Sequence, residues 1–277
     1  MLADFFYKDV TGGAELNDFA LAERFRERDY DIQEVYCREI SIDFLKKHKD
    51  AKFIVANFVT LSRSSIQYMM KNSTYVIYEH DHKYLKKRNP IFYKDFHAPE
   101  KDLANIDFFK CAKAVICLTQ LAKDVIILNT GLTNVVKIGG SVWRDQDLDH
   151  ILSLQTATKK DRYAVMNSDN PIKKRKQIIQ YCEKNNIPYD LIGDPDHFKF
   201  LEKLSEYKGL IFMTGHLETC CRLLVEAKML NCKLKYPTKL IGAASEPWFS
   251  LCGPALVEEI RNVSKNSVDI FVEALNL

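Results

Sequence analysis

The sequence predicts an α/β protein built from two doubly wound domains, and three observations support this class. The chain has 277 residues, more than a single hydrophobic core usually organises. Short runs of β-branched and aromatic residues recur along it, with room for a helix between successive runs. Some runs are apolar throughout, as in AVICL at residues 114–118, which is typical of strands buried on both faces of a parallel sheet.

The apolar runs fall into two groups, which we interpret as two sheets. The first group predicts six strands, at Asp4–Tyr7, Ile32–Tyr36, Phe53–Val59, Tyr75–Tyr78, Ala114–Leu118 and Val135–Ile138. The second group predicts four strands, at residues 163–168, 189–194, 209–213 and 233–236.

A polar stretch from Trp143 to Arg162 separates the two groups. We therefore expect domains at residues 1–150 and 151–277, with a cleft between them where the carboxyl ends of the strands meet a ligand. Residues 255–277 have the pattern of a helix, which could pack back on the first domain.

Composition and charge narrow the class of protein. Hydrophobic residues make up 47% of the chain and charged residues 28%, as in an ordinary globular protein. The formal net charge of +3 argues against a dedicated nucleic-acid coat, although runs such as Lys83–Arg88 could form a local basic surface. The eight cysteines contain no C-x-x-C pair, so neither a zinc ribbon nor a disulfide framework is indicated. No apolar run reaches the roughly 20 residues that span a bilayer, so we expect a cytoplasmic protein without integral membrane contact.

Two stretches of the first domain contain candidate site residues. Gly12 and Gly13 lie between the first strand and a helix, where their N–H groups could approach a ligand closely, although a tight turn would explain them equally well. The strand at 75–78 is followed by the sequence EHDH. We expect His80 or His82 to face a substrate at the end of this strand, the alternative being a polar surface loop.

The lysines of NSDNPIKKRK are the first candidates in the second domain. Asn170 suits the N-cap position and Pro171 the first helical position, so Lys173 and Lys174 should lie in the first turn of a helix. The helix dipole disfavours cations there by roughly several tenths of a kcal/mol each. These lysines could therefore form a phosphate site, the alternative being a solvated helix face.

Two D-x-D triplets, at residues 145–147 and 194–196, match a pattern that holds a divalent metal in some sugar-transferring enzymes. Pro195 explains the second triplet more simply as a turn. We assign no metal site.

The segment HLETCCRLLVEAKML, residues 216–230, holds two glutamates eight positions apart. Glu218 is expected just before a helix and Glu226 two turns inside it, about 12 Å further along the axis. The N–H groups of Cys220, Cys221 and Arg222 would point out of the first turn and attract a diphosphate. Two carboxylates at this spacing suit the hydroxyls at both ends of a nucleotide sugar, whereas a buried, neutralised Glu226 would be a purely structural alternative.

Four stretches taken together carry a resemblance to a known family. They are ETCCRLLVEAKMLNC with its E-x7-E spacing, the GGAE loop at residues 12–15, CAKAVICLTQLAKDVI, and LIGAASEPWF. In these stretches, and over nearly its whole length, the chain resembles retaining GT-B glycosyltransferases of the family 4 type, including short bacterial and phage forms. The resemblance implies two Rossmann-like domains, with the donor nucleotide sugar held mainly by the C-terminal one and the acceptor mainly by the N-terminal one. The family requires no metal.

The resemblance also implies roles for the candidates in the second domain. Glu218 would contact the hydroxyls of the donor sugar, and Glu226 those of the ribose. Lys173 or Lys174 would neutralise the departing diphosphate. Cys221 stands where the family often has glycine, so the approach of the backbone to the phosphate could differ here.

In the first domain, His80 or His82 would lie near the reacting carbon of the sugar, and the loop with Gly12 and Gly13 near the diphosphate or the acceptor. A retaining enzyme of this type needs no protein nucleophile. The acceptor would attack on the face from which the diphosphate leaves.

The sequence therefore predicts a glycosyltransferase that moves a hexose from a nucleotide sugar, with UDP-sugar favoured, to a hydroxyl of a glycan or small molecule. It uses no further cofactor. One alternative is a phage-type enzyme that glucosylates hydroxymethylated bases in DNA, for which the run KYLKKRNPIFYK would contact phosphates and a flipped base. The other is a non-catalytic GT-B-like binding scaffold.

Overall fold

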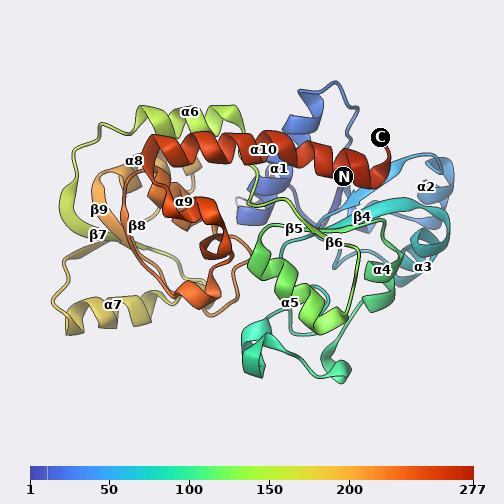
Figure 1. Ribbon diagram of the computed structural model, residues 1–277, viewed down its shortest axis with the longest axis horizontal. Helices are drawn as coiled ribbons and strands as arrows, with labels where there is room; N and C mark the ends of the chain where they lie inside the picture. The colour runs from blue at the N-terminus through green and yellow to red at the C-terminus, as the bar shows by residue number, and fades with distance from the viewer. Residues whose placement is uncertain (11) are drawn as a thin grey trace. The chain divides into compact units, whose positions relative to one another are not determined.

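The computed structural model describes residues 1–10 and 12–277, which form two compact units. Unit 1 comprises Met1–Val142 and Val263–Leu277, and unit 2 comprises Trp143–Asn262. Each unit contains a sheet of parallel strands joined by helical crossovers (Figure 1). The predicted class, an α/β protein with two doubly wound sheets, is confirmed.

Unit 1 contains a six-stranded sheet in the order β2-β1-β3-β4-β5-β6, in which all neighbouring strands are parallel. Its strands are β1 (Leu2–Ala3), β2 (Val35–Tyr36), β3 (Lys52–Val55), β4 (Thr74–Glu79), β5 (Val115–Cys117) and β6 (Val135–Lys137). Its α-helices are α1 (Gly13–Arg26), α2 (Ile42–Lys47), α3 (Arg63–Asn72), α4 (Ile106–Cys111), α5 (Gln120–Thr130) and the last part of α10 (Gly253–Leu275).

The start of unit 1 differs from the sequence-based expectation. The first strand ends at Ala3, so the predicted strand Asp4–Tyr7 begins where the observed one has finished. The carboxylate of Asp4 instead accepts hydrogen bonds from the backbone N–H groups of Val59 (2.7 Å) and Thr60 (2.8 Å). Asp4 therefore ties the end of β1 to the loop after β3.

Unit 2 contains a four-stranded parallel sheet in the order β10-β9-β7-β8. The strands are β7 (Lys160–Met166), β8 (Tyr189–Ile192), β9 (Tyr207–Ile211) and β10 (Lys233–Lys235). The helices are α6 (Asp145–Ser153), α7 (Arg175–Lys184), α8 (His197–Ser205), α9 (Arg222–Met229) and the first part of α10.

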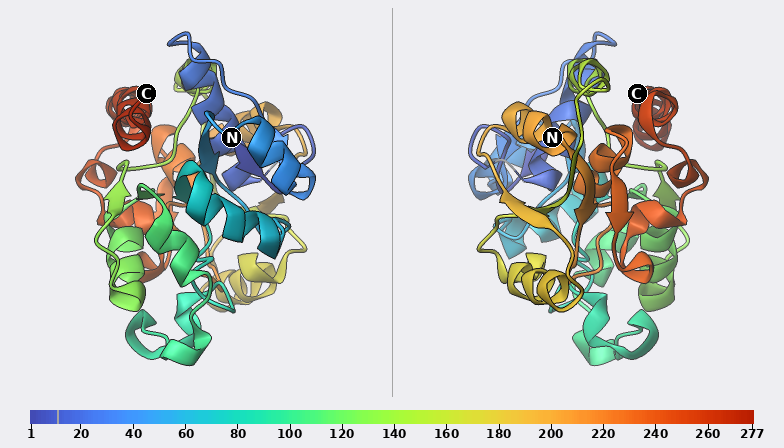
Figure 2. Two further views of the ribbon diagram at one scale, coloured as in Figure 1. Left: turned by 90° about the vertical axis from the view of Figure 1, so that its right-hand side faces the viewer. Right: turned by 90° about the vertical axis from the view of Figure 1, so that its left-hand side faces the viewer.

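Helices cover both faces of the unit 2 sheet. On one face, Ile178 and Cys182 of α7 form a core cluster with Val165 and Ile211. Helices α8 and α9 contact each other and β9, and Figure 1 shows them on the side of the strands away from α7. The right-hand view of Figure 2 shows α7, in yellow, on one side of these strands and α8, in orange, on the other. The carboxyl ends of β7, β8 and β9 all meet at one edge, because the strands are parallel.

Helices α6 and α10 lie at the two points where the chain passes from one unit to the other. The polar stretch after Trp143 forms α6, which buries Leu148 and Ile151. Helix α10 runs through residues of both units, and within unit 1 its Phe271 packs against Phe25 and Tyr78, with ring centroids 6.1 and 5.0 Å apart. None of the helices in the described ranges combines the length and hydropathy that crossing a membrane requires.

Candidate functional site

A lysine–glutamate pair lies at the carboxyl edge of the unit 2 sheet. Lys173 ends a short 3-10 helix after β7, and its Nζ lies 3.1 Å from Oε1 of Glu218, in the loop that follows β9. The hydroxyl of Thr214 donates to the same oxygen at 3.1 Å. Burial by itself lowers the pKa of Lys173, but the charges of Glu218 and Cys221 outweigh it and the pKa is raised. Lys173 is therefore kept in its protonated form.

The backbone around Glu218 is fixed by the segment LIGAAS. The N–H of Glu218 donates to the carbonyl of Leu240 (2.9 Å), and its carbonyl accepts from the N–H of Gly242 (2.8 Å). In the described part of the chain, Oε2 of Glu218 has no hydrogen-bond partner, and the side chain is 19% exposed. One carboxylate oxygen thus remains for a ligand.

Lys174 does not contact Glu218. It adopts a left-handed backbone conformation (φ 50°) as the N-cap of α7. Its side chain lies over Gly215, where an added Cβ would be 2.7 Å from Cε of Lys174. It also lines a pocket of about 470 Å³, with walls that include Tyr181, Phe212 and Tyr236. Of the two lysines left open by the sequence, only Lys173 contacts Glu218.

Glu226 is buried in a network of its own within unit 2. Its Oε1 accepts a hydrogen bond from Nε1 of Trp143 (3.1 Å) and lies 3.2 Å from Nε2 of His197 and 3.6 Å from Nη2 of Arg222. Burial alone would raise the pKa of Glu226, but the charge and hydrogen bond of His197, then Arg222 and Trp143, lower it to about 2. Glu226 is thus buried in its ionised form.

The start of α9 differs from the expected geometry. The helix begins at Arg222, so Cys220 lies before it and Cys221 is its N-cap. Cys221 is buried with φ 77°, a conformation that favours glycine. The guanidinium of Arg222 stacks over Trp143, 4.1 Å from the ring centroid, and is directed at Glu226. Its side chain is therefore part of the interior network.

In unit 1, the Glu79 of EHDH is the last residue of β4 and the other three residues follow the strand. The two histidines have different surroundings. Nε2 of His80 lies 2.7 Å from Oδ1 of the buried Asp18 on α1. The His80 ring also packs edge-on against Tyr78, with centroids 4.3 Å apart. His82 is fully buried, with Nδ1 2.8 Å from the hydroxyl of Tyr84. His82 is thus an interior residue, and the side chain of His80 is also nearly buried, with 5% of it exposed.

The glycine loop begins α1. Gly12 is the N-cap and Gly13 the first helical residue, while Thr11 lies outside the described residues. A Cβ on Gly12 would come within 2.2 Å of a carboxylate oxygen of Glu15. Burial raises the pKa of Glu15 and outweighs a backbone hydrogen bond and the charge of His80, which both lower it, while the charges of Asp18 and Asp81 raise it further. The absent side chain at Gly12 therefore makes room for Glu15 beside the His80–Asp18 pair.

A basic pocket of about 820 Å³ lies beyond the ends of β3 and β4 in unit 1. Its cationic lining includes Arg63, Lys86 and Arg88, and its apolar lining includes Phe58 and Leu85. Of the run Lys83–Arg88, only the last three residues are exposed. Lys83 is buried and paired with Glu79 (3.4 Å) and with Asp81.

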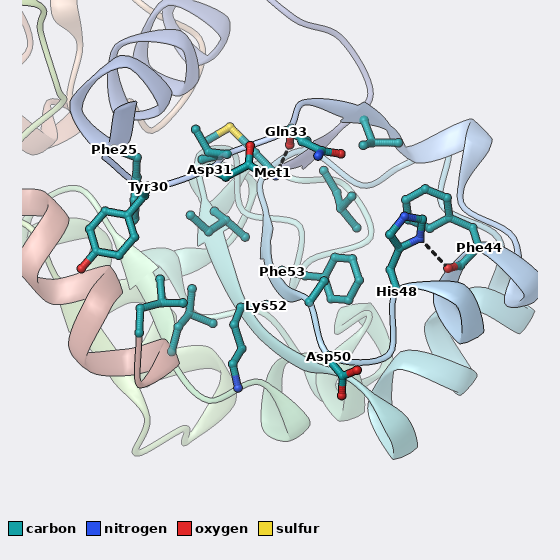
Figure 3. Close-up of a pocket in the computed structure, with 17 residues that line it drawn as sticks. Met1, Phe25, Tyr30, Asp31, Gln33, Phe44, His48, Asp50, Lys52 and Phe53 are labelled. Carbon is teal, nitrogen blue, oxygen red and sulfur yellow. Dashed lines mark hydrogen bonds between the residues drawn. The ribbon is translucent and has the colours of Figure 1, made fainter. Parts of the chain in front are cut away.

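A second pocket of unit 1, of about 360 Å³, lies at the opposite edge of the sheet (Figure 3). Lys52 and Phe53, at the start of β3, line it together with Phe44 and His48, whose Nδ1 lies 2.9 Å from the carbonyl oxygen of Phe44. It contains none of the predicted site residues.

The two D-x-D triplets have structural roles. Asp194 pairs with Lys203 (2.8 Å), and Asp196 caps α8. Asp145 pairs with Arg261, and Asp147 with Arg144, both at 2.6 Å. Among the residues described, no three His, Cys, Asp or Glu side chains gather as metal ligands would.

Three polar residues of these networks were not singled out from the sequence: His197, Thr214 and Asp18. Each of the three follows or faces the carboxyl end of a strand. In the sequence this position only weakly indicates a functional residue. Their partners, Glu226, Glu218 and His80, are 29, 4 and 62 positions away. Only the three-dimensional structure reveals these contacts.

No family model matches the sequence, and no curated protein is significantly similar to it. Solved structures do match. HepE of Anabaena in complex with UDP is 12% identical with a TM-score of 0.53, and the match covers 99% of this chain and 94% of that one. HepE in complex with UDP and glucose gives 11% identity, a TM-score of 0.51 and the same coverage.

A third match is the α-glucosyltransferase of phage T4, in complex with UDP and a 13-mer DNA containing an HMU base. It is 11% identical with a TM-score of 0.53, and the match covers 99% of this chain and 91% of that chain. At this level of identity the likeness concerns the fold. The chain has the fold of a GT-B glycosyltransferase over nearly its entire length.

Proposed function

We propose that the protein is a retaining glycosyltransferase that transfers a hexose from a UDP-sugar to a hydroxyl of a glycan or small molecule in the cytoplasm. Unit 2, which contains residues 151–262 of the expected donor domain, binds the nucleotide sugar. Unit 1 binds the acceptor. We propose that the chain is a short glycosyltransferase of the family 4 type, with Glu218 and Glu226 as its E-x7-E pair.

One observation carries the proposal. In a chain with the GT-B fold, the Lys173–Glu218 pair lies at the carboxyl edge of the unit 2 sheet, which is where open α/β sheets bind ligands. The pair offers a cation for a diphosphate and a carboxylate oxygen for sugar hydroxyls. The relatives in fold bind UDP, and one of them also glucose.

The proposed reaction breaks the bond between the anomeric carbon and the diphosphate oxygen and forms a bond between that carbon and the acceptor oxygen on the same face. The electron pair of the broken bond stays on the diphosphate, and the acceptor proton passes to a phosphate oxygen. Lys173 stabilises the negative charge that develops on the leaving group. Glu218 holds the sugar hydroxyls, so that the reacting atoms meet in a fixed orientation.

His80 is the proposed residue next to the reacting carbon, because it directly follows the last residue of β4, whereas His82 is fully buried. Gly12 and Gly13 begin α1 beside His80 and Glu15, where the backbone would approach the diphosphate or the acceptor. With Lys173 as the cation, the proposed chemistry needs no metal.

A thermal-shift panel of UDP, GDP, ADP and their sugar conjugates, with and without EDTA, tests the proposal. A ligand at 100 times its Kd should stabilise the protein by about 2.7 kcal/mol. We expect a shift with UDP and UDP-hexose that EDTA does not change. In Glu218→Ala the shift with UDP should remain and the additional shift that the hexose gives should be lost. If no nucleotide shifts the melting temperature, the proposal is refuted and the scaffold alternative gains support.

One second candidate rests on the basic pocket of unit 1. Arg63, Lys86 and Arg88 line it, and the exposed Phe92 lies near Lys87 in the same region of sequence. These groups suit the phosphates and a base of a nucleic acid acceptor, as in transfer to hydroxymethylated DNA. Binding to DNA that weakens steeply with added salt would support this acceptor, and DNA-independent turnover with no such binding would exclude it.

A further inference from the structure

A pocket of about 470 Å³ in unit 2 lies between α7 and the strands β9 and β10. Gln177 and Tyr181 of α7 form part of its lining. Ile211 of β9 and Lys235 of β10 also line it. These two residues are neighbours in the register of the strands, so their side chains project from the same face of the sheet. The volume is in the range that small-molecule sites have, and the proposed reaction does not use this pocket.

The charged side chains that line this pocket are all positive. They are Lys174, which is the N-cap of α7, and Lys235; of the described residues in the lining, none is an aspartate or a glutamate. Neither lysine forms an ion pair in the part of the chain that the structure describes. Nζ of Lys235 lies 5.7 Å from the centroid of the Tyr163 ring. The two ammonium groups therefore make the pocket complementary to an anion.

Lys174 reaches the pocket from an unfavourable backbone conformation. Its φ of 50° lies in the left-handed region, which favours glycine over a residue with a side chain. The Lys174 side chain passes over Gly215, where an added Cβ would lie 2.7 Å from Cε of the lysine. A lysine thus stands where glycine would be more stable, and a glycine leaves the space that this lysine occupies. Strained residues of this kind are concentrated at ligand sites.

The aromatic side chains suit the pocket to a ring that carries hydroxyl groups. Tyr181 and Tyr236 line it, and the Tyr236 ring packs edge-on against Phe249 with centroids 5.8 Å apart. The faces of tyrosine rings provide apolar area, and the phenol hydroxyls can donate or accept hydrogen bonds. The amide of Gln177 adds a donor and an acceptor to the same lining. A sugar ring has the matching properties, apolar C–H faces and several hydroxyls.

We propose that this pocket is a site for a phosphorylated monosaccharide. A phosphate monoester has a charge of about −1.5 to −2 at pH 7, which the ammonium groups of Lys174 and Lys235 balance. The sugar ring lies against Tyr181 and Tyr236, with its hydroxyls bonded to the phenols and to Gln177. A phosphate or a sugar by itself matches only one part of this lining. The site goes beyond the proposed function and does not depend on it.

The pocket adjoins the Lys173–Glu218 pair without including it. Thr214 lines the pocket and donates a hydrogen bond to Oε1 of Glu218 (3.1 Å). Phe212 also lines it, and the centroid of its ring lies 5.4 Å from Nζ of Lys173. These two residues separate the sugar phosphate from the proposed donor nucleotide, so we expect both ligands to bind at the same time.

Calorimetric titration of the full chain with glucose 6-phosphate, in the absence of nucleotide, tests the site. We expect glucose and inorganic phosphate each to bind at least about tenfold more weakly, because each lacks one of the two groups that the lining recognises. Lys235→Gln removes one ammonium group and should weaken the binding of glucose 6-phosphate about tenfold. Tyr181→Ala should weaken glucose 6-phosphate binding and leave that of inorganic phosphate unchanged. The matched control is Lys233→Gln, an exposed lysine of β10 that is outside the lining.

The inference is overturned if glucose 6-phosphate does not bind, or if it binds equally well to the wild-type chain and to either Lys235→Gln or Tyr181→Ala. Inorganic phosphate that binds as tightly as glucose 6-phosphate would indicate an adventitious anion site only. Displacement of glucose 6-phosphate by UDP would place it in the donor site and refute a separate pocket. If UDP does not bind but glucose 6-phosphate does, with the expected effects of the variants, the proposed function fails and this inference stands. A melting curve of each variant confirms that a changed constant does not come from unfolding.

Discussion

Replacing Glu226 by glutamine should destabilise unit 2 strongly, because it removes the carboxylate that contacts both His197 and Arg222. The pKa of Glu226 lies at about 2 instead of its ordinary 4.5, and a difference of this size corresponds to about 3 kcal/mol. Glutamine has the same shape but no charge, so the two buried cations would lose the counter-charge of Glu226. We therefore expect Glu226→Gln to lower the free energy of unfolding by about 3 kcal/mol.

The effect depends on pH in a defined way. The pKa of Glu226 is lowered, so its contribution is present above pH 4.5 and is lost as the pH falls towards 2. The pKa of His197 is raised above its ordinary 6.5, because Glu226 outweighs the opposite effect of burial. Its contribution is complete below pH 6.5 and is lost as the pH rises through the raised value. The difference between wild type and variant should therefore be largest between about pH 4.5 and 6.5.

Urea unfolding followed by tryptophan fluorescence measures this difference directly. Both tryptophans of the chain, Trp143 and Trp248, belong to unit 2, so the signal reports on that unit. The control is Glu202→Gln, which removes the exposed partner of His150 and should change the stability by less than about 0.5 kcal/mol. A loss below about 1 kcal/mol at pH 6 for Glu226→Gln, or a loss that does not vary with pH, would refute the reasoning.

Three further predictions concern the candidate residues. Lys173→Ala should lower kcat by about 100-fold or more in an assay of UDP release, because it removes the cation paired with Glu218, whereas Lys174→Ala should lower it less than tenfold; equal effects would contradict this assignment. His80→Gln, whose amide can still bond to Asp18, should lower kcat with a smaller loss of melting temperature than His82→Ala, which removes a fully buried ring; the reverse pattern would exchange their roles. Cys221→Gly should be tolerated in urea unfolding, whereas Cys221→Val should cost about 2 kcal/mol because φ is 77°; equal stability of the two variants would show that the backbone relaxes.

Most of the fold could be predicted from the sequence because its central strands are apolar throughout. Residues 75–78 are all buried, and the predicted run overlaps β4. The two-residue strands β1 and β2 contain too few residues to show a period, which is why their predicted limits were wrong. The run DFFY is apolar enough for a strand, yet Asp4 ends the ladder by bonding to the loop after β3.

The candidate site could be predicted only in part. The pattern of residues 216–230 identified Glu218 and Glu226 but not what they touch. Adjacent lysines cannot be separated by periodicity, and neither the left-handed backbone of Lys174 nor the contact of Lys173 with Glu218 has a signal in the local sequence. Contacts such as Glu226 with His197 depend on the packing of α8 on α9, for which the local sequence contains no signal.

Helix α10 has a consequence for the order in which the protein is completed during synthesis. Unit 2 is continuous in the chain, whereas unit 1 includes Val263–Leu277, which are made after all of unit 2. Until then, Phe25 and Tyr78 lack the ring of Phe271, and Arg28 lacks its partner Asp269. Synthesis of unit 1 therefore starts before that of unit 2 and ends after it. While unit 2 is being made, the incomplete unit 1 exposes the apolar surface that Phe271 later covers.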